Sequence, residues 1–515
     1  MFKKENSDKK KIVKGVSLSW LKFFLTLVIG VVQTPLLFKN LPSHELNTWY
    51  IFFSFGAFLL ISDLGLVSSI SRIIAYLDSS AGLANDEKTA VVFRSYSIKQ
   101  IYTTSLLSFS FFLVVFGVVI SACYYWAHYK DDPLISLSFV IFVVGIIFNL
   151  LSNVPTAVLN GHRDVGFDSI VRSAAQMVYF LALFFLLPVF KSIVFVACAF
   201  TIQNFLQFVV LQEIMKRRQK KIFSEKISWK ETIRLNIVKN LYRQSLPLAV
   251  NQVGEWLTTQ GSVFVASLVL GSDKLSDFVV NQQLFSYGIA ISLVINQIIG
   301  PFIAKQYIEN QREKLITYYK NTTIASLSIV SLFLAALYSS CDNIIDLWVG
   351  PQHFLGYHFA VVFALITFFE VQHSVAGNFV WNMGKWPFNN WTIASGILNI
   401  LLAYVLGKQM GLFGIALASF LSKIVTLNWY VMFYCLKKLG LSISNYLKNV
   451  FVPIVGSVLF TISVVLYAKK SIYTVADNEL ISIVLVTAVS SLIFAALTVI
   501  FFKKSLKPFL LMLKR

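Results

Sequence analysis

The sequence predicts an all-α polytopic membrane protein with about 14 transmembrane helices. Of the 515 residues, 57% are hydrophobic and only 13% are charged, whereas about 25% are charged in a soluble domain. The apolar residues also gather in runs of about twenty, the length of a helix that crosses a bilayer. The runs do not alternate in segments of about ten residues, as the strands of a membrane β-barrel do.

Fourteen such runs follow one another along the chain. The first run comes after a basic segment, MFKKENSDKKKIVKG, and is too long for a signal-peptide core, so we interpret it as an uncleaved span. Between residues 168 and 211 there is almost no loop, but the run is too long for one span. The predicted spans are 15–38, 49–77, 98–122, 134–159, 168–189, 192–211, 244–270, 278–303, 321–341, 357–383, 390–407, 411–435, 449–468 and 479–502.

The charges of the loops predict how these spans are oriented. Alternate loops carry 33 and 7 lysines and arginines, and the richer set faces the cytoplasm under the positive-inside rule. Both chain ends belong to the richer set, so we expect both termini in the cytoplasm. The net charge of +20 would suggest nucleic acid in a soluble protein, but here it sits in loops between spans, so no nucleic-acid partner is expected.

The longest loop divides the chain into similar halves. We predict a six-helix bundle at 1–212, a cytoplasmic basic linker at 213–243, a second six-helix bundle at 244–435, and two appended helices with a cytoplasmic tail at 436–515. Matches at an offset of 229 residues, such as Leu41 with Leu270, suggest that the bundles are parallel repeats. Two six-helix halves with a substrate site between them are a transporter architecture.

Within the linker, the stretch ISWKETIRLNIVKNLYR has two interpretations. It fits an amphipathic helix that lies on the inner membrane surface and is held by anionic lipids. It fits a solvated basic linker equally well.

Cysteines and sequence motifs give no sign of an enzyme. Cys123, Cys198, Cys341 and Cys435 lack the spacing of a metal site, and no hydrolase, nucleotide-binding or metalloprotease signature is present. We therefore expect no catalysis, no metal and no cofactor. Cys123 and Cys341 both fall near predicted outer helix ends, which leaves a disulfide between them open.

Ionisable residues inside the spans cost about 2.5–3.5 kcal/mol each on insertion scales, so each needs a physical reason. Arg72 and Arg172 are shallow, and either snorkel to the interface or bind a ligand. Lys22 lies deeper and either snorkels or lines a cavity open to the cytoplasm. The full set is Lys22, Asp63, Arg72, Arg172, Glu255, Glu370, His373 and Lys423.

Glu255, Glu370 and Lys423 lie close to the predicted bilayer midplane, where a side chain cannot snorkel. Each therefore needs a water-filled cavity or an opposite charge. One interpretation is a structural ion pair between Lys423 and Glu370. The other is that these residues bind substrate or a coupling ion, because a buried carboxyl group can exchange a proton near neutral pH. His373 shares a helix face with Glu370 and titrates in the same range.

Asparagine and glutamine are also frequent within the spans. Hydrogen bonds between helices explain them, but so does a polar cavity that passes a hydroxyl-rich molecule such as a sugar. Examples are Asn149, Asn153, Gln176, Gln203, Asn204, Asn251, Gln252, Asn281, Gln282, Gln283, Asn296 and Gln297.

The second span resembles a known family. LPSHELNTWYIFFSFGAFLLISDLGLVSSISRIIA (Leu41–Ala75) is similar to the bacterial polysaccharide-exporter and O-antigen (O-unit) flippase family of the multidrug/oligosaccharidyl-lipid/polysaccharide transporter superfamily. Asp63-Leu64-Gly65-Leu66 and Arg72 carry this match. NGHRDVGF (Asn160–Phe167) and GLFGIALASFLSKIV (Gly411–Val425) resemble the family's loop after span four and the start of its span twelve. The resemblance covers spans 1–12.

The resemblance implies a flippase of the bacterial inner membrane whose two six-helix bundles open alternately to each side. The implied substrate is an undecaprenyl-pyrophosphate-linked oligosaccharide for surface polysaccharide such as lipopolysaccharide, with a polysaccharide polymerase as a further partner. Spans 13 and 14 would contact the polyprenyl chain. The pyrophosphate needs cationic partners, for which Lys22, Arg72, Arg172 and Lys423 are the candidates. The candidates for coupling to H⁺ or Na⁺ are Glu255, Glu370, His373 and Asp63.

Two other functions stay open. A drug or organic-cation antiporter of the same fold would need acids that dominate its cavity, and basic residues in spans 1, 2, 5 and 12 argue against it. A membrane-embedded polysaccharide polymerase is expected to carry a large periplasmic loop. The longest loop here is basic and assigned to the cytoplasm.

Overall fold

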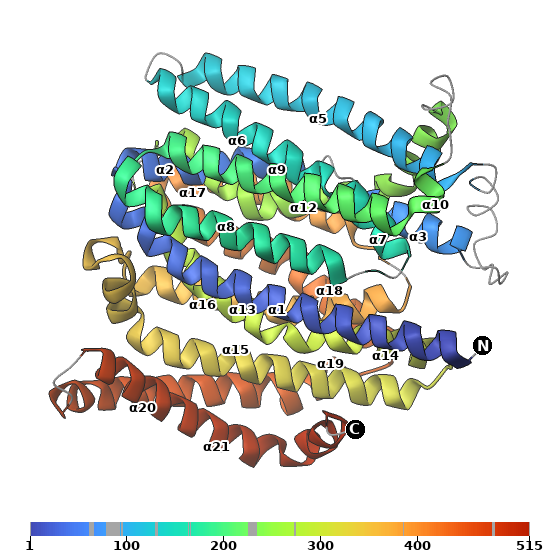
Figure 1. Cartoon of the computed structure of the whole chain (residues 1–515). Coiled ribbons are helices and arrows are strands. Elements are labelled where there is room, and N and C mark those ends of the chain that lie inside the picture. The colour runs from blue at the N-terminus through green and yellow to red at the C-terminus, as the bar shows by residue number, and fades with distance from the viewer. Residues whose placement is uncertain are drawn as a thin grey trace. The chain divides into compact units, whose positions relative to one another are not determined.

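The computed structural model is helical wherever it shows regular secondary structure. It describes residues 2–60, 66–78, 93, 96–128, 132–162, 164, 166–224, 234–271, 274–384, 386–475 and 479–513. In these ranges, eleven helical segments are long and apolar enough to cross a membrane. The prediction of an all-α polytopic membrane protein is confirmed (Figure 1). The chain forms two compact units, residues 1–256 and 257–515.

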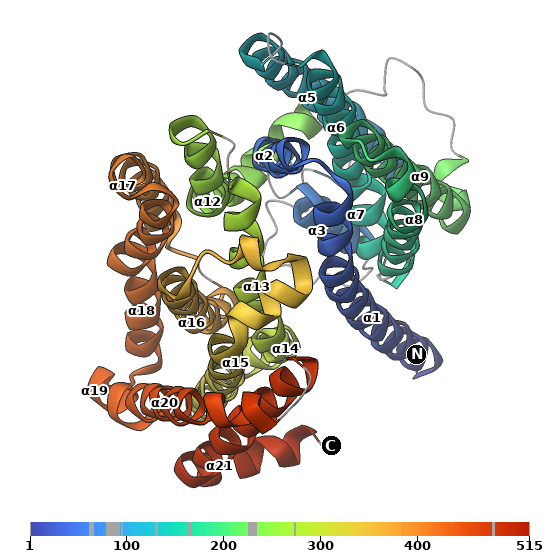
Figure 2. The same ribbon diagram turned by 90° about the vertical axis from the view of Figure 1, so that its left-hand side faces the viewer.

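The first unit packs its helices around a buried aromatic core. α6 packs on α9, α8 packs on both α9 and α1, and α2 and α5 contact α6 (Figure 2). Trp49 and Phe142 are fully buried, with ring centroids 5.4 Å apart. The helices are α1 (Phe2–Asn40), α2 (Ser43–Leu60), α3 (Leu66–Asp78), α5 (Ile98–His128), α6 (Pro133–Leu151), α7 (Asn153–Gly161), α8 (Gly166–Phe190), α9 (Ile193–Arg218), α10 (Lys220–Phe223) and the first part of α12 (Leu235–Val269).

The second unit is built around α15, which contacts α13, α14, α16, α20 and α21. The last two helices therefore pack along one side of this central helix (Figure 1). The elements are α13 (Leu275–Ser292), α14 (Val294–Ile308), α15 (Arg312–Val349), η2 (Pro351–His353), α16 (Tyr357–Asn382), α17 (Asn389–Lys423), η3 (Ile424–Asn428), α18 (Trp429–Leu439), α19 (Ile443–Tyr446), η4 (Leu447–Phe451), α20 (Val452–Val475) and α21 (Glu479–Leu513).

A glycine turn separates the predicted spans 390–407 and 411–435, which both lie in the segment that starts with α17. Gly411 has φ 63° and ψ −144°, a conformation that is essentially restricted to glycine. The chain folds back on itself there, so that Ser422 Oγ donates to Asn399 Oδ1 at 3.4 Å. Gly414 packs against the backbone of Leu406, with no room for a Cβ atom.

The part of the amphipathic stretch that starts at Leu235 does not form a separate helix. These residues are the first turns of α12 and continue without a break into the predicted seventh span. Ile237 and Leu241 are buried in the core of the first unit, and the Tyr242 ring lies 5.3 Å from the Phe112 ring of α5. Ile237 and Leu241 are therefore covered by protein, whereas Leu235 is exposed. The described part of the stretch is the start of the long helix α12, and not a separate surface helix or a solvated linker. Residues 225–233 lie outside the described ranges.

Contacts between loops agree with the predicted alternation of the spans. Glu45, which begins α2, accepts a hydrogen bond from the backbone N–H of Ile193 at 2.5 Å. On the opposite set of loops, the Arg312 side chain donates to the Leu439 carbonyl at 3.1 and 3.2 Å. Each contact joins loops that the prediction places on one side. Which side is cytoplasmic stays a prediction.

Candidate functional site

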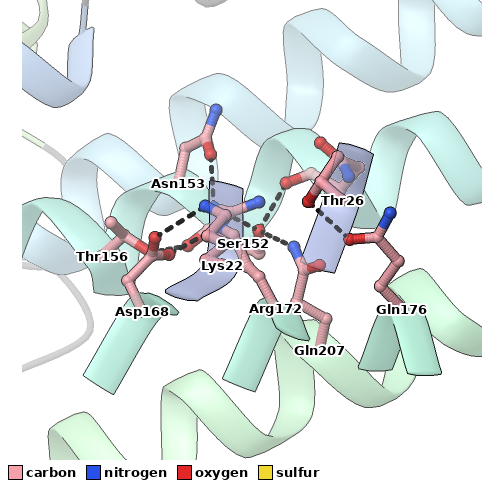
Figure 3. A network of polar contacts seen from close by, with 10 residues as sticks. Lys22, Thr26, Ser152, Asn153, Thr156, Asp168, Arg172, Gln176 and Gln207 are labelled. Carbon is pink, nitrogen blue, oxygen red and sulfur yellow. Dashed lines mark hydrogen bonds and ion pairs between the residues drawn. The ribbon is translucent and has the colours of Figure 1, made fainter. Parts of the chain in front are cut away.

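A polar cluster in the first unit brings together two of the predicted cationic residues (Figure 3). Asp168 Oδ1 accepts hydrogen bonds from Arg172 Nε at 2.5 Å and from Thr156 Oγ1 at 2.9 Å. Its other oxygen, Oδ2, lies 3.5 Å from Lys22 Nζ. The side chains of Asp168 and Arg172 are 15% and 17% exposed, and that of Lys22 is 33% exposed. A single carboxylate is thus shared by two cations.

Helix geometry explains why these residues meet. Asp168 and Arg172 are four residues apart on α8, so they share one helix face. Lys22 comes from α1, which packs along α8. Arg172 is therefore not a snorkelling anchor, because its guanidinium is held inside the unit.

A break in the fourth span supplies the rest of the cluster. α6 ends at Leu151 and α7 begins at Asn153. The Ser152 hydroxyl between them accepts from Arg172 Nη2 at 3.2 Å and from Gln207 Nε2 at 2.7 Å, and Asn153 Oδ1 accepts from the same Nη2 at 2.9 Å. The oxygen atoms at this break therefore fix the orientation of the guanidinium.

Interhelical hydrogen bonds account for several of the predicted amides. Gln176 Oε1 on α8 accepts from Thr26 Oγ1 on α1 at 2.8 Å (Figure 3). Asn149 Nδ2 on α6 donates to Asn204 Oδ1 on α9 at 2.7 Å. These bonds join α8 to α1 and α6 to α9, as the interpretation of the amides as interhelical partners predicted.

The charge of this cluster suits an anion. Lys22 and Arg172 together carry two positive charges and Asp168 carries one negative charge, so a positive charge remains in excess. Ammonium and guanidinium groups are the usual protein partners of phosphate oxygens. Because Lys22 is one-third exposed, a ligand can reach its ammonium group.

The second unit contains a separate ion pair. Lys423 Nζ at the end of α17 lies 3.0 Å from Glu370 Oε2 on α16, and the two side chains are 15% and 23% exposed. The structure thus contains the ion pair that one of the two interpretations proposed. His373 lies one turn after Glu370, and its Nδ1 is buried and makes no hydrogen bond in the structure.

Of the other three predicted residues, the structure describes the side chain of Glu255 but not those of Asp63 and Arg72. Glu255 on α12 is exposed and accepts a hydrogen bond from Asn251 Nδ2 at 2.7 Å. Asp63 lies outside the described residues. Arg72 belongs to α3, but its side chain lies outside the described part. Among the described residues, no three His, Cys, Asp or Glu side chains lie close enough together to hold a metal ion.

Sequence reasoning missed two acidic residues. Asp168 stands at the predicted start of span five and was not counted as intramembrane, although its spacing of four from Arg172 was a usable signal. Asp277 at the start of α13 lies 2.6 Å from Nδ1 of His353 in η2. Nothing in the sequence links these two positions, which are 76 residues apart.

The disulfide left open by the sequence is not present. None of the four cysteines, all within the described residues, forms a disulfide; Cys123 is exposed and Cys341 is buried.

Comparison with known sequences gives one partial relative. No protein-family model matches the chain. The uncharacterized membrane protein EpsK of Bacillus subtilis (strain 168) is 22% identical over 230 residues, which are 43% of this chain and 44% of that protein. The match thus spans less than half the length of this curated relative.

Comparison with solved structures identifies the fold. A structure described as lipid II flippase MurJ in an inward closed conformation has a TM-score of 0.68 at 15% identity, covering 95% of this chain and 99% of that one. The chain therefore shares its fold with this flippase and with the transporters described next. An inward-facing multidrug resistance MATE family transporter has a TM-score of 0.56 at 14% identity, covering 83% of this chain and 98% of its own.

A MOP superfamily transporter from Pyrococcus furiosus, whose structure is described as having a binding pocket of reverse polarity, has a TM-score of 0.53. It is 13% identical, and the match covers 84% of this chain and 96% of that one. At these identities the similarity concerns the fold. The flippase match extends over more of this chain than either transporter match.

Proposed function

We propose that the protein is a flippase that moves undecaprenyl-pyrophosphate-linked oligosaccharide units across the bacterial inner membrane by alternating access. The observation that carries the proposal is the cluster in which Lys22 and Arg172 share the single carboxylate of Asp168. Its excess positive charge complements a pyrophosphate. The fold similarity to a lipid II flippase over 95% of the chain supports a lipid-linked substrate.

The polar surroundings of the cluster suit the sugar part of this substrate. Hydroxyl and amide groups of Thr26, Gln176 and Gln207 lie beside the charged residues (Figure 3). Such groups can exchange their mutual hydrogen bonds for bonds to sugar hydroxyls at small net cost, because each hydrogen bond lost is replaced. Arg72 and Lys423 are further cationic candidates from the sequence.

Transport against a gradient requires an energy source, and the acids in the spans are the candidates. Glu255, His373 and Asp63 would take up and release H⁺ or Na⁺. Glu370 would exchange H⁺, because Lys423 holds the place of a metal cation beside it. Anionic lipids would bind the basic end of α9, where Lys216, Arg217 and Arg218 are exposed. A polysaccharide polymerase would take over the flipped units.

A drug or organic-cation antiporter is the second candidate, favoured by the MATE-like fold and by the exposed acid Glu255. It ranks lower because the polar cluster carries excess positive charge, which repels a cationic substrate. A membrane-embedded polymerase ranks third, since the longest loop is the basic linker and no observation favours catalysis.

The test is a deletion strain examined for lipid-linked oligosaccharide and for surface polysaccharide. Loss of surface polymer with complete units accumulating on the cytoplasmic leaflet supports the flippase. Unchanged surface polymer refutes it and makes drug export the leading function, and units accumulating on the periplasmic leaflet indicate the polymerase.

Complementation then tests the site itself. Arg172→Ala and Lys22→Ala should fail to restore surface polymer when they are expressed at wild-type levels. Lys408→Ala is the matched control, because Lys408 is an exposed lysine on α17 whose ammonium group donates to Tyr404 Oη at 2.5 Å and lies over the Tyr404 ring. It should complement fully.

A further inference from the structure

We propose that Lys423 is a tethered cation that fills a monovalent-cation site on Glu370. Lys423 Nζ lies 3.0 Å from Glu370 Oε2, and 53 residues separate the two along the chain. The ammonium group of Lys423 thus occupies the place beside the carboxylate that a sodium or ammonium ion would otherwise take. The role of this site in transport rests on the proposed function, but occupancy of the site does not.

The surroundings of the pair make a cation at Glu370 necessary. The ring of the adjacent Phe369 lies 6.1 Å from that of Phe420 and 5.9 Å from that of Trp429, so aromatic side chains pack between α16 and the helices α17 and α18 next to the pair. The Glu370 and Lys423 side chains are themselves mostly buried, at 23% and 15% exposure. An ionised carboxylate in apolar surroundings is stable only with a counter-charge. A cation must therefore stay beside Glu370 whenever this side chain is ionised.

His373 supplies a second group suited to a cation. It lies one turn after Glu370 on α16 and interacts electrostatically with both Glu370 and Lys423. Its Nδ1 is buried and has no hydrogen-bond partner in the structure. A carboxylate oxygen and an imidazole nitrogen can both accept hydrogen bonds from an ammonium ion.

The backbone at Lys423 is also unusual. α17 ends at this residue, and the next five, Ile424–Asn428, form a π-helix. π-helical turns are rare in proteins, and many of those that do occur lie at functional sites. The wide turn changes the register of the helix directly after the lysine, and Asn428 at its end carries a buried side-chain oxygen that makes no hydrogen bond in the structure.

A consequence follows for the energy source. As long as Lys423 is present, the Glu370 position takes no sodium from solution. Loss of the ammonium group should turn this position into a site for a free cation. The substitution that tests this is Lys423→Ala, which leaves the carboxylate and His373 in place.

The experiment measures thermal unfolding of the purified full-length protein in chloride salts of choline, sodium and ammonium at equal ionic strength. Wild type and Glu370→Gln should respond alike to the three salts, because Glu370 takes up no free cation in wild type. Lys423→Ala should unfold at a temperature about 2–4 °C higher in sodium or ammonium chloride than in choline chloride. The choline ion is too large to enter the site. Lys423→Ala/Glu370→Gln should lose this difference.

Two controls separate the site from general effects. Lys408→Ala removes an exposed lysine on the other side of the Gly411 turn in α17, and Lys423→Arg keeps the tethered charge, so neither should respond to the type of cation. If Lys423→Ala cannot be purified in choline, it should be recovered in ammonium chloride.

Three results would overturn the proposal. They are equal unfolding of Lys423→Ala in all salts, a sodium-specific response of wild type that Glu370→Gln removes, and failure of ammonium to recover an unstable variant. No substrate is present in this measurement. A negative transport result would therefore refute the flippase and leave this inference standing. A negative result in the unfolding experiment would refute this inference and leave the flippase standing.

Discussion

Replacing Asp168 by asparagine should destabilise the first unit more than removing either of its cationic partners. The carboxylate accepts from Arg172 at 2.5 Å and from Thr156 at 2.9 Å, and it lies 3.5 Å from Lys22. Loss of a partner from a buried ion pair costs about 3–5 kcal/mol, because the remaining charge stays buried. We expect about 3 kcal/mol for Asp168→Asn, since the amide oxygen keeps one hydrogen bond and Lys22 can turn toward water.

Lys22→Ala should cost much less. Its ammonium is one-third exposed and lies at the long end of the range for an ion pair, and such pairs contribute about 0–1 kcal/mol. Arg172→Ala should fall between the two, because Lys22 still compensates Asp168 while Ser152 and Asn153 lose a donor. The assay is equilibrium unfolding in mixed micelles, followed by tryptophan fluorescence. An unfolding free energy lowered by less than about 1 kcal/mol in Asp168→Asn, or lowered more in Lys22→Ala than in Asp168→Asn, would refute the view that Asp168 is the shared counter-charge of the cluster.

The other predictions concern the turn in α17 and the orientation of the chain. Gly411→Ala should lower the free energy of unfolding by about 1–3 kcal/mol through backbone strain alone, because a Cβ atom there meets no other atom within 4 Å. Gly414→Ala should lower it more in the same unfolding assay, since its Cβ atom would collide with the Leu406 carbonyl. In spheroplasts, a membrane-impermeant thiol reagent should label Ser43→Cys at once but Glu309→Cys only after permeabilisation, in a background without native cysteines. The opposite pattern would invert the predicted topology.

Most of the fold could be predicted from the sequence because bilayer thickness fixes the length of an apolar helix. The turn at Gly411 was predicted as well, because a lysine and polar residues interrupt the apolar pattern near it. The breaks at Ser152 and at Leu293, between α13 and α14, were not predicted. Both occur inside predicted spans, where single polar residues such as Ser152 and Asn153 are too few to end an apolar run.

The candidate site could be predicted only in part, and the reason is the pairing of helices. Depth alone gave a Glu370–Lys423 ion pair as one of two interpretations, since both residues needed a counter-charge near the same level. Depth could not show that α1 packs along α8, which is the fact that joins Lys22 to Asp168. Asp168 itself was missed because a residue at the end of a predicted span looks like a loop residue.

The two charge clusters also narrow the choice of groups that would hold a pyrophosphate. In the second unit, one cation faces one carboxylate, so an anion that bound Lys423 would have to displace Glu370 and leave it buried without a counter-charge, at several kcal/mol. In the first unit, two cations face one carboxylate, so an anion can bind Lys22 while Arg172 keeps Asp168 neutralised. If the protein moves a pyrophosphate-linked substrate, the head group should therefore bind at Lys22 and Arg172, and Lys423 should remain with Glu370.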